Sequence, residues 1–76
     1  MKAYVLMKVR TGEIRDVVRH MRKVESVREV TMTFGPYDAV ALVEAEDLNA
    51  LGDTLANDIQ PIPGVEETLT CLAVDL

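Results

Sequence analysis

The chain is poor in the residues that build disulfide frameworks and metal centres. Its 76 residues include one cysteine, one histidine and no tryptophan. The single cysteine, Cys71, excludes an intramolecular disulfide, behaves as a small hydrophobe of an apolar strand, and favours a reducing, cytoplasmic location. His20 has no partner at a metal-site spacing and is interpreted as a solvated surface residue. We therefore expect no metal and no cofactor.

Long apolar runs and an excess of positive charge are also missing. No uninterrupted apolar run exceeds five residues, as at residues 3–7, which is too short for a membrane span or a signal peptide. Thirteen acidic residues outnumber eight basic ones and give a net charge of −5, which disfavours a surface that collects phosphates. We expect neither membrane insertion nor direct DNA binding.

What the chain does contain is a hydrophobic pattern whose period changes along the sequence. Apolar residues recur at helical spacing over residues 14–24. A second helix is predicted over 48–59, capped by Asp47 and ended by Pro61, with Leu48, Leu51, Leu55 and Ile59 as its buried stripe. β-rich segments predict four strands, at residues 3–9, 27–34, 39–45 and 65–76.

The order βαββαβ predicts a ferredoxin-like α+β fold in a single domain, residues 1–76. Its antiparallel four-stranded sheet carries both helices on one face. The other face is bare, and apolar side chains that point away from the helices need a cover. A second sheet from another copy is the simplest cover, so we expect a homodimer of the dimeric α+β barrel type. Candidates for this bare face are Leu6, Leu42, Leu72 and Val74.

Catalytic residues are not expected, because the chemistry-bearing patterns are incomplete. Arg10-Thr11-Gly12 is too short a match to the phosphate-cradling loop that acylphosphatases carry on the same fold. RNA-recognition sheets stack bases on aromatics of two central strands, and here Tyr4 stands alone. The acidic residues of the second half are interpreted as a solvated rim and one helix cap: Glu44, Glu46, Asp47, Asp53 and Asp58.

The strongest candidate for a binding site is the turn after the second strand, taken with the last strand. Its glycine-containing turn exposes backbone N–H groups beside a carboxylate and a phenol, and alternate threonines on two strands are expected to place hydroxyls along one side of the sheet. Hydroxyls and turn amides would bind the carboxylate of a small amino acid, and Asp38 would accept from its ammonium. The candidate residues are Thr31, Thr33, Gly35, Pro36, Tyr37, Asp38, Thr68 and Thr70.

A structural interpretation of the same residues stays open. The turn would then only fix the register of the hairpin, and the threonines would be strand formers. The residues alone favour neither the binding interpretation nor the structural one.

At these positions the chain resembles the effector-binding domain of the leucine-responsive and asparagine-responsive regulators, the Lrp/AsnC family, also called the RAM domain. The resemblance spans nearly all of the chain. It implies two sheets packed face to face in a dimer, dimers assembled into an octamer or a similar ring, and a small amino acid held between dimers. The segments that carry it are AYVLMKV (3–9), VREV (27–30), GPYD (35–38), VEAEDL (43–48) and IPGV (62–65), with Thr68 and Thr70.

Two residues depart from the family pattern. Phe34 stands where the family usually has threonine, and Ser26 where it usually has glycine. Phe34 removes a hydroxyl and adds bulk beside the turn. Full regulators also carry an amino-terminal helix-turn-helix, whereas Met1 here runs straight into the first predicted strand. We expect a stand-alone module that regulates transcription of amino-acid metabolism by binding an amino acid, or by joining assemblies of full-length Lrp/AsnC regulators.

Three alternatives share the fold. An ACT-like amino-acid sensor would hold its ligand where helices meet the sheet. A ligand-free oligomerisation module would bind no small molecule. A small dimeric α+β barrel monooxygenase would turn over an aromatic substrate with oxygen.

Overall fold

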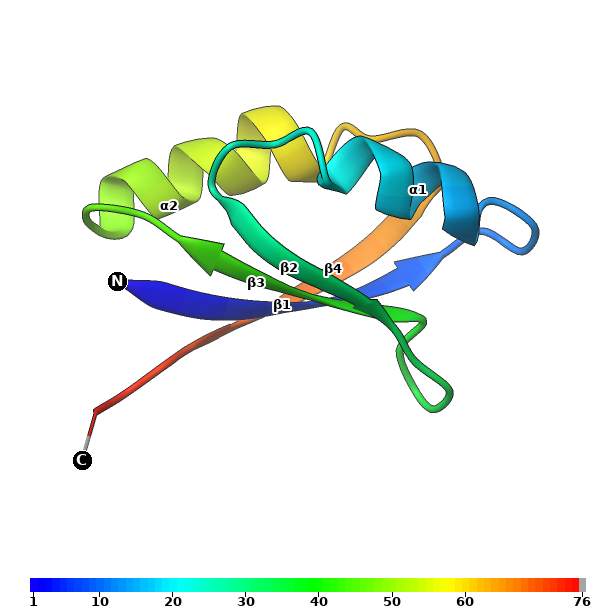
Figure 1. The fold of residues 1–76 in the computed structure, drawn as a ribbon, viewed down its shortest axis with the longest axis horizontal. Helices are drawn as coiled ribbons and strands as arrows, with labels where there is room; N and C mark the ends of the chain where they lie inside the picture. Colours follow the sequence, from blue (N-terminus) through cyan, green and yellow to red (C-terminus); the bar gives the residue numbers. More distant parts are fainter. Residues whose placement is uncertain (76) are drawn as a thin grey trace.

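Figure 1 shows the computed structural model, which describes residues 1–75. Two helices cover one face of a four-stranded sheet, which confirms the predicted βαββαβ arrangement. Neither helix within the described residues has the length and apolar character of a membrane span. The elements are β1 (Lys2–Val9), α1 (Ile14–Met21), β2 (Val27–Met32), β3 (Ala39–Glu44), α2 (Leu48–Thr54), η1 (Leu55–Ile59), a π-helical turn that continues α2, and β4 (Val65–Leu72).

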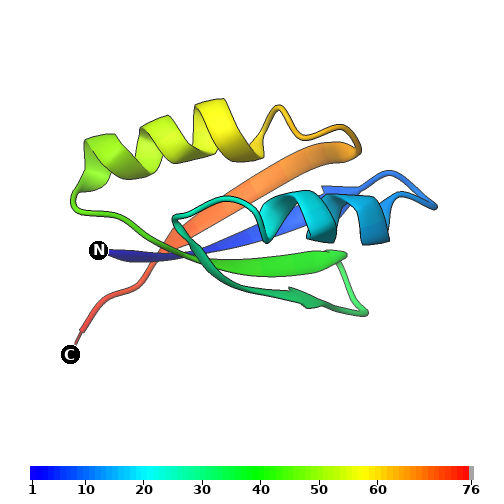
Figure 2. The same cartoon turned by 45° about the horizontal axis from the view of Figure 1, so that its top comes forward.

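The sheet has the order β2-β3-β1-β4, with every neighbouring pair antiparallel. β1 and β3 are therefore central, and β2 and β4 form the two edges. Figure 2 shows α1 and α2–η1 side by side over the same face. Each helix follows a strand and returns over the sheet, because parallel strands that are not adjacent need a long connection.

The core lies between this face and the helices. Alternate residues of β1 and β3 point into it, as the period of two in a strand requires. The helices contribute residues from their apolar stripes, including the fully buried Val17 and Met21 of α1. The buried strand residues are Ala3, Val5, Met7, Val9, Ala39, Ala41 and Val43.

The opposite face of the sheet is uncovered in the chain. By register Leu6 lies beside Val40 and Leu69, and Tyr4 beside Leu42 and Cys71. Tyr4 keeps 46% and Leu69 48% of its surface exposed, so this is an apolar surface in water. We call it the open face: Tyr4, Leu6, Val40, Leu42, Leu69 and Cys71. Cys71 is exposed there instead of buried inside its own chain.

Two residues expected on the open face are placed elsewhere. Leu72 is paired with the buried Ala3 and so belongs to the helix side of the sheet, and Val74 lies beyond β4. The predicted last strand was too long, since β4 ends at Leu72; Leu76, its predicted last residue, lies outside the described residues.

The predicted helices need smaller corrections. α1 ends at Met21, three residues earlier than expected. Asp47 caps α2 as predicted, and its Oδ1 accepts from the backbone N–H of Ala50 at 2.8 Å. Leu48 was wrongly placed in the buried stripe: it is 59% exposed, because the first turn of α2 lies at the margin of the sheet (Figure 1).

Candidate functional site

The turn between β2 and β3 is fastened to β1 by Asp38. Its backbone N–H donates to the carbonyl of Met7 at 2.8 Å, and its Oδ2 accepts from the backbone N–H of Val9, also at 2.8 Å. The β1–β3 ladder ends at the pair Met7 and Ala39. Asp38 therefore adds two hydrogen bonds to β1 beyond the end of the ladder, one through its backbone and one through its side chain. The carboxylate thus satisfies a backbone donor that the sheet leaves unpaired.

Thr33 closes the other side of the turn. Its N–H donates to the carbonyl of Asp38 at 3.0 Å, and its hydroxyl donates to the carbonyl of Tyr37 at 2.7 Å. Gly35 has φ +148°, a backbone conformation that side chains disfavour. Thr33 and Asp38 therefore have a structural role in the turn, which favours part of the structural interpretation. A carboxylate has about four acceptor sites, so the hydrogen bond from Val9 leaves Asp38 able to accept from a ligand.

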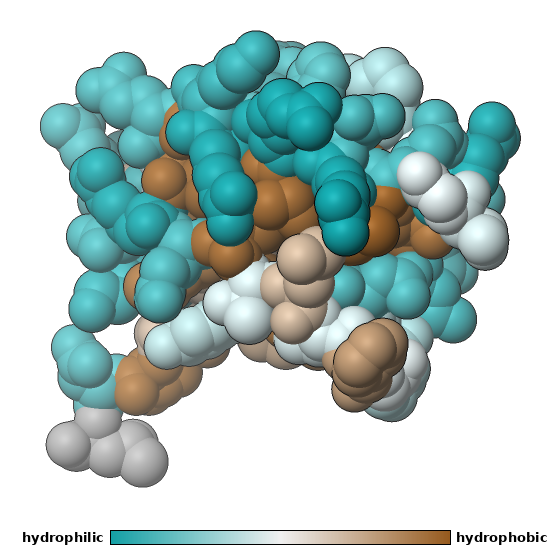
Figure 3. Space-filling model, turned by 45° about the vertical axis from the view of Figure 1, so that its right-hand side comes forward, coloured by the Kyte–Doolittle hydropathy of each residue, from teal (hydrophilic) through white to brown (hydrophobic). Residues whose placement is uncertain are grey.

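A cleft of about 560 Å³ lies between this hairpin and the loop from β1 to α1. Both segments lie at the right of Figure 1, and Figure 3 brings that side forward, where apolar surface gathers below the hydrophilic helix layer. The lining is mostly apolar but includes one carboxylate, hydroxyls and guanidinium groups. Its residues are Val9, Arg10, Thr11, Gly12, Ile14, Arg15, Met32, Thr33, Phe34 and Asp38.

The two arginines of the cleft differ in their partners. Arg10 Nε lies 3.5 Å from Glu13 Oε2, an oxygen that is otherwise without a partner. Arg15 takes part in none of the ion pairs found within residues 1–75. Arg15 is therefore the cation of the cleft that remains available to an anionic group.

The predicted site residues do not all come together in one chain. Thr33 and Asp38 line the cleft, whereas Gly35, Pro36 and Tyr37 belong to the turn but not to its lining. Phe34, noted above only as a departure from the family pattern, is fully exposed and lines the cleft as well.

The expectation that the threonines share one side of the sheet is wrong. Thr31 pairs with Val40 on the open face, whereas Thr68 and Thr70 pair with the buried Met7 and Val5 and so lie on the helix side. Gln60 Nε2 donates to Thr68 Oγ1 at 3.3 Å. β2 and β4 are opposite edges, three strand spacings or about 14 Å apart. Within one chain these hydroxyls cannot meet one ligand.

The wall formed by residues 9–15 was not found from the sequence. The sequence predicted a loop at Arg10-Thr11-Gly12 after the first strand, but this loop was compared only with phosphate-binding loops, which it matches poorly. Antiparallel pairing of β1 with β3 places this loop beside the hairpin, although the two belong to segments that are not adjacent in sequence. Two charged residues could have indicated this site from the sequence: Arg10 in the loop and Asp38 in the turn.

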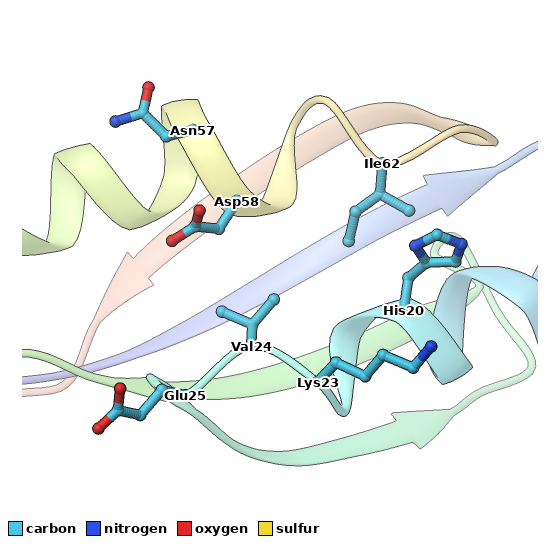
Figure 4. Close-up of a pocket in the computed structure, with 7 residues that line it drawn as sticks. All are labelled: His20, Lys23, Val24, Glu25, Asn57, Asp58 and Ile62. Carbon is cyan, nitrogen blue, oxygen red and sulfur yellow. The ribbon is translucent and has the colours of Figure 1, made fainter.

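A second cleft, of about 390 Å³, lies between the end of α1 and η1. Figure 4 shows His20 and Lys23 on the α1 side and Asp58 on the η1 side, with Asp58 pointing toward Val24 and Asn57 pointing away. His20 is exposed, as predicted. Within the described residues no group of three or more His, Cys, Asp or Glu side chains could hold a metal ion.

Fold and site together define the class of this protein: a ferredoxin-like domain with an open sheet face and a cleft beside its hairpin. A family model described as the Lrp/AsnC ligand binding domain matches residues 2–75. The chain belongs to this family, and the resemblance found in the sequence is confirmed.

Two relatives of the chain are transcriptional regulators. The HTH-type transcriptional regulator FL11 of Pyrococcus abyssi is 35% identical over 77 residues, which cover 97% of this chain and 48% of the regulator. The chain thus spans about half the length of this relative. The regulator of the same name from Pyrococcus horikoshii is 34% identical over 74 residues, again 97% of this chain and 48% of the regulator.

Several solved structures are also similar to this chain. TTHA0845 from Thermus thermophilus has 35% identity and a TM-score of 0.92, with 99% of this chain and 94% of that chain covered. The transcriptional regulator NMB0573 of Neisseria meningitidis, solved as a complex with L-Met, has 17% identity and a TM-score of 0.90, with 97% of this chain and 49% of that chain covered. The second likeness shows the fold alone.

Proposed function

We propose that this domain binds a small amino acid at the hairpin cleft and thereby regulates transcription of amino-acid metabolism. The observation that carries the proposal is that Asp38 and Arg15 line the same cleft, and their opposite charges would suit the two charged groups of one small molecule. An α-amino acid needs an acceptor for its ammonium and a cation or N–H donors for its carboxylate. The volume lies within the range of small-molecule sites.

Self-association completes the site. The open face is apolar, and packing it on the open face of a second copy removes that surface from water. Thr68 and Thr70 do not line the cleft of their own chain, and we propose that they approach an effector from another protomer. We therefore propose a homodimer through the open face, further assembly of dimers into a ring such as an octamer, and an effector held between dimers.

Two modes of action fit such a module. It acts alone as an amino-acid-binding oligomer, or it joins assemblies of full-length Lrp/AsnC regulators and alters their response. Both place it in the cytoplasm, and in neither does the domain catalyse a reaction or contact DNA. The regulators among its relatives support a role in transcription.

The test is thermal denaturation of the purified chain with each of the twenty amino acids. A ligand that binds the folded state raises stability by RT ln(1 + [L]/Kd), so a subset of amino acids should raise the melting temperature in a concentration-dependent manner. No shift with any of the twenty at millimolar concentration would contradict the effector proposal and favour a ligand-free oligomerisation module. A shift that requires Lys23 and Asp58 instead of Arg15 and Asp38 would move the ligand to the cleft between the end of α1 and η1 and contradict the proposed site.

A further inference from the structure

The two signs of charge are separated along the chain. All eight Lys and Arg residues lie between Lys2 and Arg28, and ten of the thirteen acidic residues follow Arg28. The fold turns this division in sequence into a division in space, because α1 belongs to the first part of the chain and α2–η1 to the second. The helix layer therefore contains one basic helix and one acidic helix.

The basic helix carries cations that the chain itself does not neutralise. Arg19 lies 2.9 Å from Asp16, one turn earlier on α1. The other Lys and Arg side chains of α1 and of the turn that follows it are exposed, and they take part in none of the ion pairs of residues 1–75: Arg15, Arg22 and Lys23. They remain available to the carboxylates of another molecule.

The acidic helix is likewise without counter-charges. Residues 46–59, which comprise α2–η1 and the two residues before it, contain no Lys or Arg. Asp58 and Lys23 line the same cleft, but Figure 4 shows their side chains extending in different directions. The acidic side chains of this segment are all exposed, and in the described part of the chain they form no ion pair: Glu46, Asp47, Asp53 and Asp58.

We propose that the helix layer binds the helix layer of a second copy of this chain, with α1 of each copy against α2–η1 of the other. A partner for this layer needs carboxylates opposite α1 and cations opposite α2–η1, and a second copy supplies both. A two-fold axis that passes between the two helices exchanges them, so each contact forms twice. The alternative orientation, with α1 against α1, would bring like charges together and is disfavoured.

This contact differs in position and in kind from those proposed above, and it does not depend on amino-acid binding. The helix layer and the open face lie on opposite sides of the sheet, so a dimer formed through the open face leaves the helix layer accessible (Figure 1). Among the exposed large hydrophobic residues of the described chain, only Leu48 lies on a helix. The contact is therefore polar, and exposed ion pairs are individually weak and are screened by salt. We expect a weak, salt-sensitive association in addition to the open-face dimer.

The experiment is sedimentation equilibrium of the full chain at about 0.1 M and about 1 M salt, where the Debye length is about 10 Å and about 3 Å. The helix-layer association should weaken by about fivefold or more at the higher concentration, because several exposed ion pairs are screened together. The open-face contact is apolar and has no charge to be screened. The salt-sensitive part of the association therefore reports the helix layer.

Two double variants identify the groups involved. Arg22→Glu with Lys23→Glu reverses the charge at the end of α1, and Asp53→Lys with Asp58→Lys reverses the two carboxylates within α2–η1. Each double variant alone should lose the salt-sensitive association, because like charges then face each other. An equimolar mixture of the two should regain it, since each altered helix again meets the opposite charge.

The matched control changes the net charge of −5 by the same amount as the Asp53 and Asp58 pair. Glu29→Lys with Glu66→Lys replaces exposed carboxylates on the edge strands β2 and β4, outside the helix layer. This control should keep the association. All these side chains are exposed, and circular dichroism verifies that each variant is folded.

The outcomes separate this contact from the other proposals. An association that is equal at both salt concentrations, or that is absent beyond the open-face dimer at about 0.1 M salt, would overturn the helix-layer contact. Equal effects of the control and of the Asp53 and Asp58 pair would show that net charge alone governs association, and would also overturn it. Complete dissociation to monomers at about 1 M salt would contradict the open-face dimer instead.

Discussion

Asp38 and Val9 are 29 residues apart in sequence and are joined by a 2.8 Å hydrogen bond from the backbone N–H of Val9 to Asp38 Oδ2. This contact fixes the position of the hairpin relative to the end of β1. It also determines the distance between the two walls of the cleft, because residues 9–15 follow directly from Val9. One carboxylate thus serves the fold and, by our proposal, the ligand.

The two roles of Asp38 can be separated by substitution. Asp38→Ala leaves the part-buried N–H of Val9 without a partner and should lower the free energy of unfolding by about 1–3 kcal/mol. Asp38→Asn keeps an acceptor oxygen and should cost about 1 kcal/mol or less. Both variants should lose the response to amino acids, because both remove the charge that faces the ammonium. Urea denaturation with and without an amino acid that stabilises the wild-type chain measures both effects, and a normal response of Asp38→Asn would exclude the ligand role.

Arg15 is expected to bind the ligand carboxylate without supporting the fold. Arg15→Gln should weaken binding of an amino acid that stabilises the wild-type chain by about tenfold or more, since a hydrogen bond to a charged group is worth about 1.5–3 kcal/mol. Stability should change by less than about 0.5 kcal/mol, as for other surface substitutions. Arg19→Gln is the matched control, because Arg19 lies on the same helix and pairs with Asp16 at 2.9 Å, outside the cleft. Equal effects of both variants on calorimetric affinity would refute the assignment.

The open face should mediate the dimer. Leu6 lies at its centre between Val40 and Leu69, so Leu6→Glu would place a charge in an interface that excludes water. The variant should sediment as a monomer and keep the circular dichroism of the folded chain, because the side chain contributes nothing to the core. Leu48→Glu makes the same chemical change on an exposed residue of α2 and should leave the dimer intact. A wild-type chain that is monomeric at micromolar concentration would contradict the proposed assembly.

Two glycines with positive φ should differ in their tolerance of alanine. Gly12 has φ +87° and no atom within 4 Å of an added Cβ, whereas Gly64 has φ +99° and an added Cβ would lie 3.0 Å from Val17 Cγ2. Gly12→Ala should cost about 1–2 kcal/mol from backbone strain. Gly64→Ala should cost at least about 1 kcal/mol more, because it also overpacks a core residue. Chemical denaturation of the two variants compares these costs. Equal losses of unfolding free energy would show that the Val17 side chain moves away from the added methyl group with little loss of stability.

Much of the fold could be predicted from the sequence, because the local preferences of these residues agree with the tertiary structure. The apolar spacing of Val17, Val18 and Met21 predicted a helix whose buried residues are those three. Asp47 acted as the expected cap, and the turn at residues 35–38 lies where glycine and proline require it. The family was also readable, since ordered short motifs covered the chain.

The errors occur where burial depends on distant segments. Leu48 fits the apolar stripe of α2, but the first turn of this helix lies at the margin of the sheet and leaves Leu48 exposed. Thr68 and Thr70 alternate with Leu69 just as a one-sided strand should, yet the register with β1 turns the hydroxyls toward the helices. A shift of one residue exchanges the two faces of a strand, so alternation alone could not assign them.

Local patterns in the chain were enough to establish the elements, their order and the chemical character of the turn, because propensity, spacing and turn chemistry act over a few residues. The cleft, by contrast, exists only in the folded chain. Its two walls come from residues 9–15 and 32–38, and only antiparallel pairing of β1 with β3, reinforced by the Val9–Asp38 hydrogen bond, brings them face to face. Side chains that are distant in sequence become one site when strand register fixes their separation, and the pattern of one strand does not by itself say which strand it pairs with.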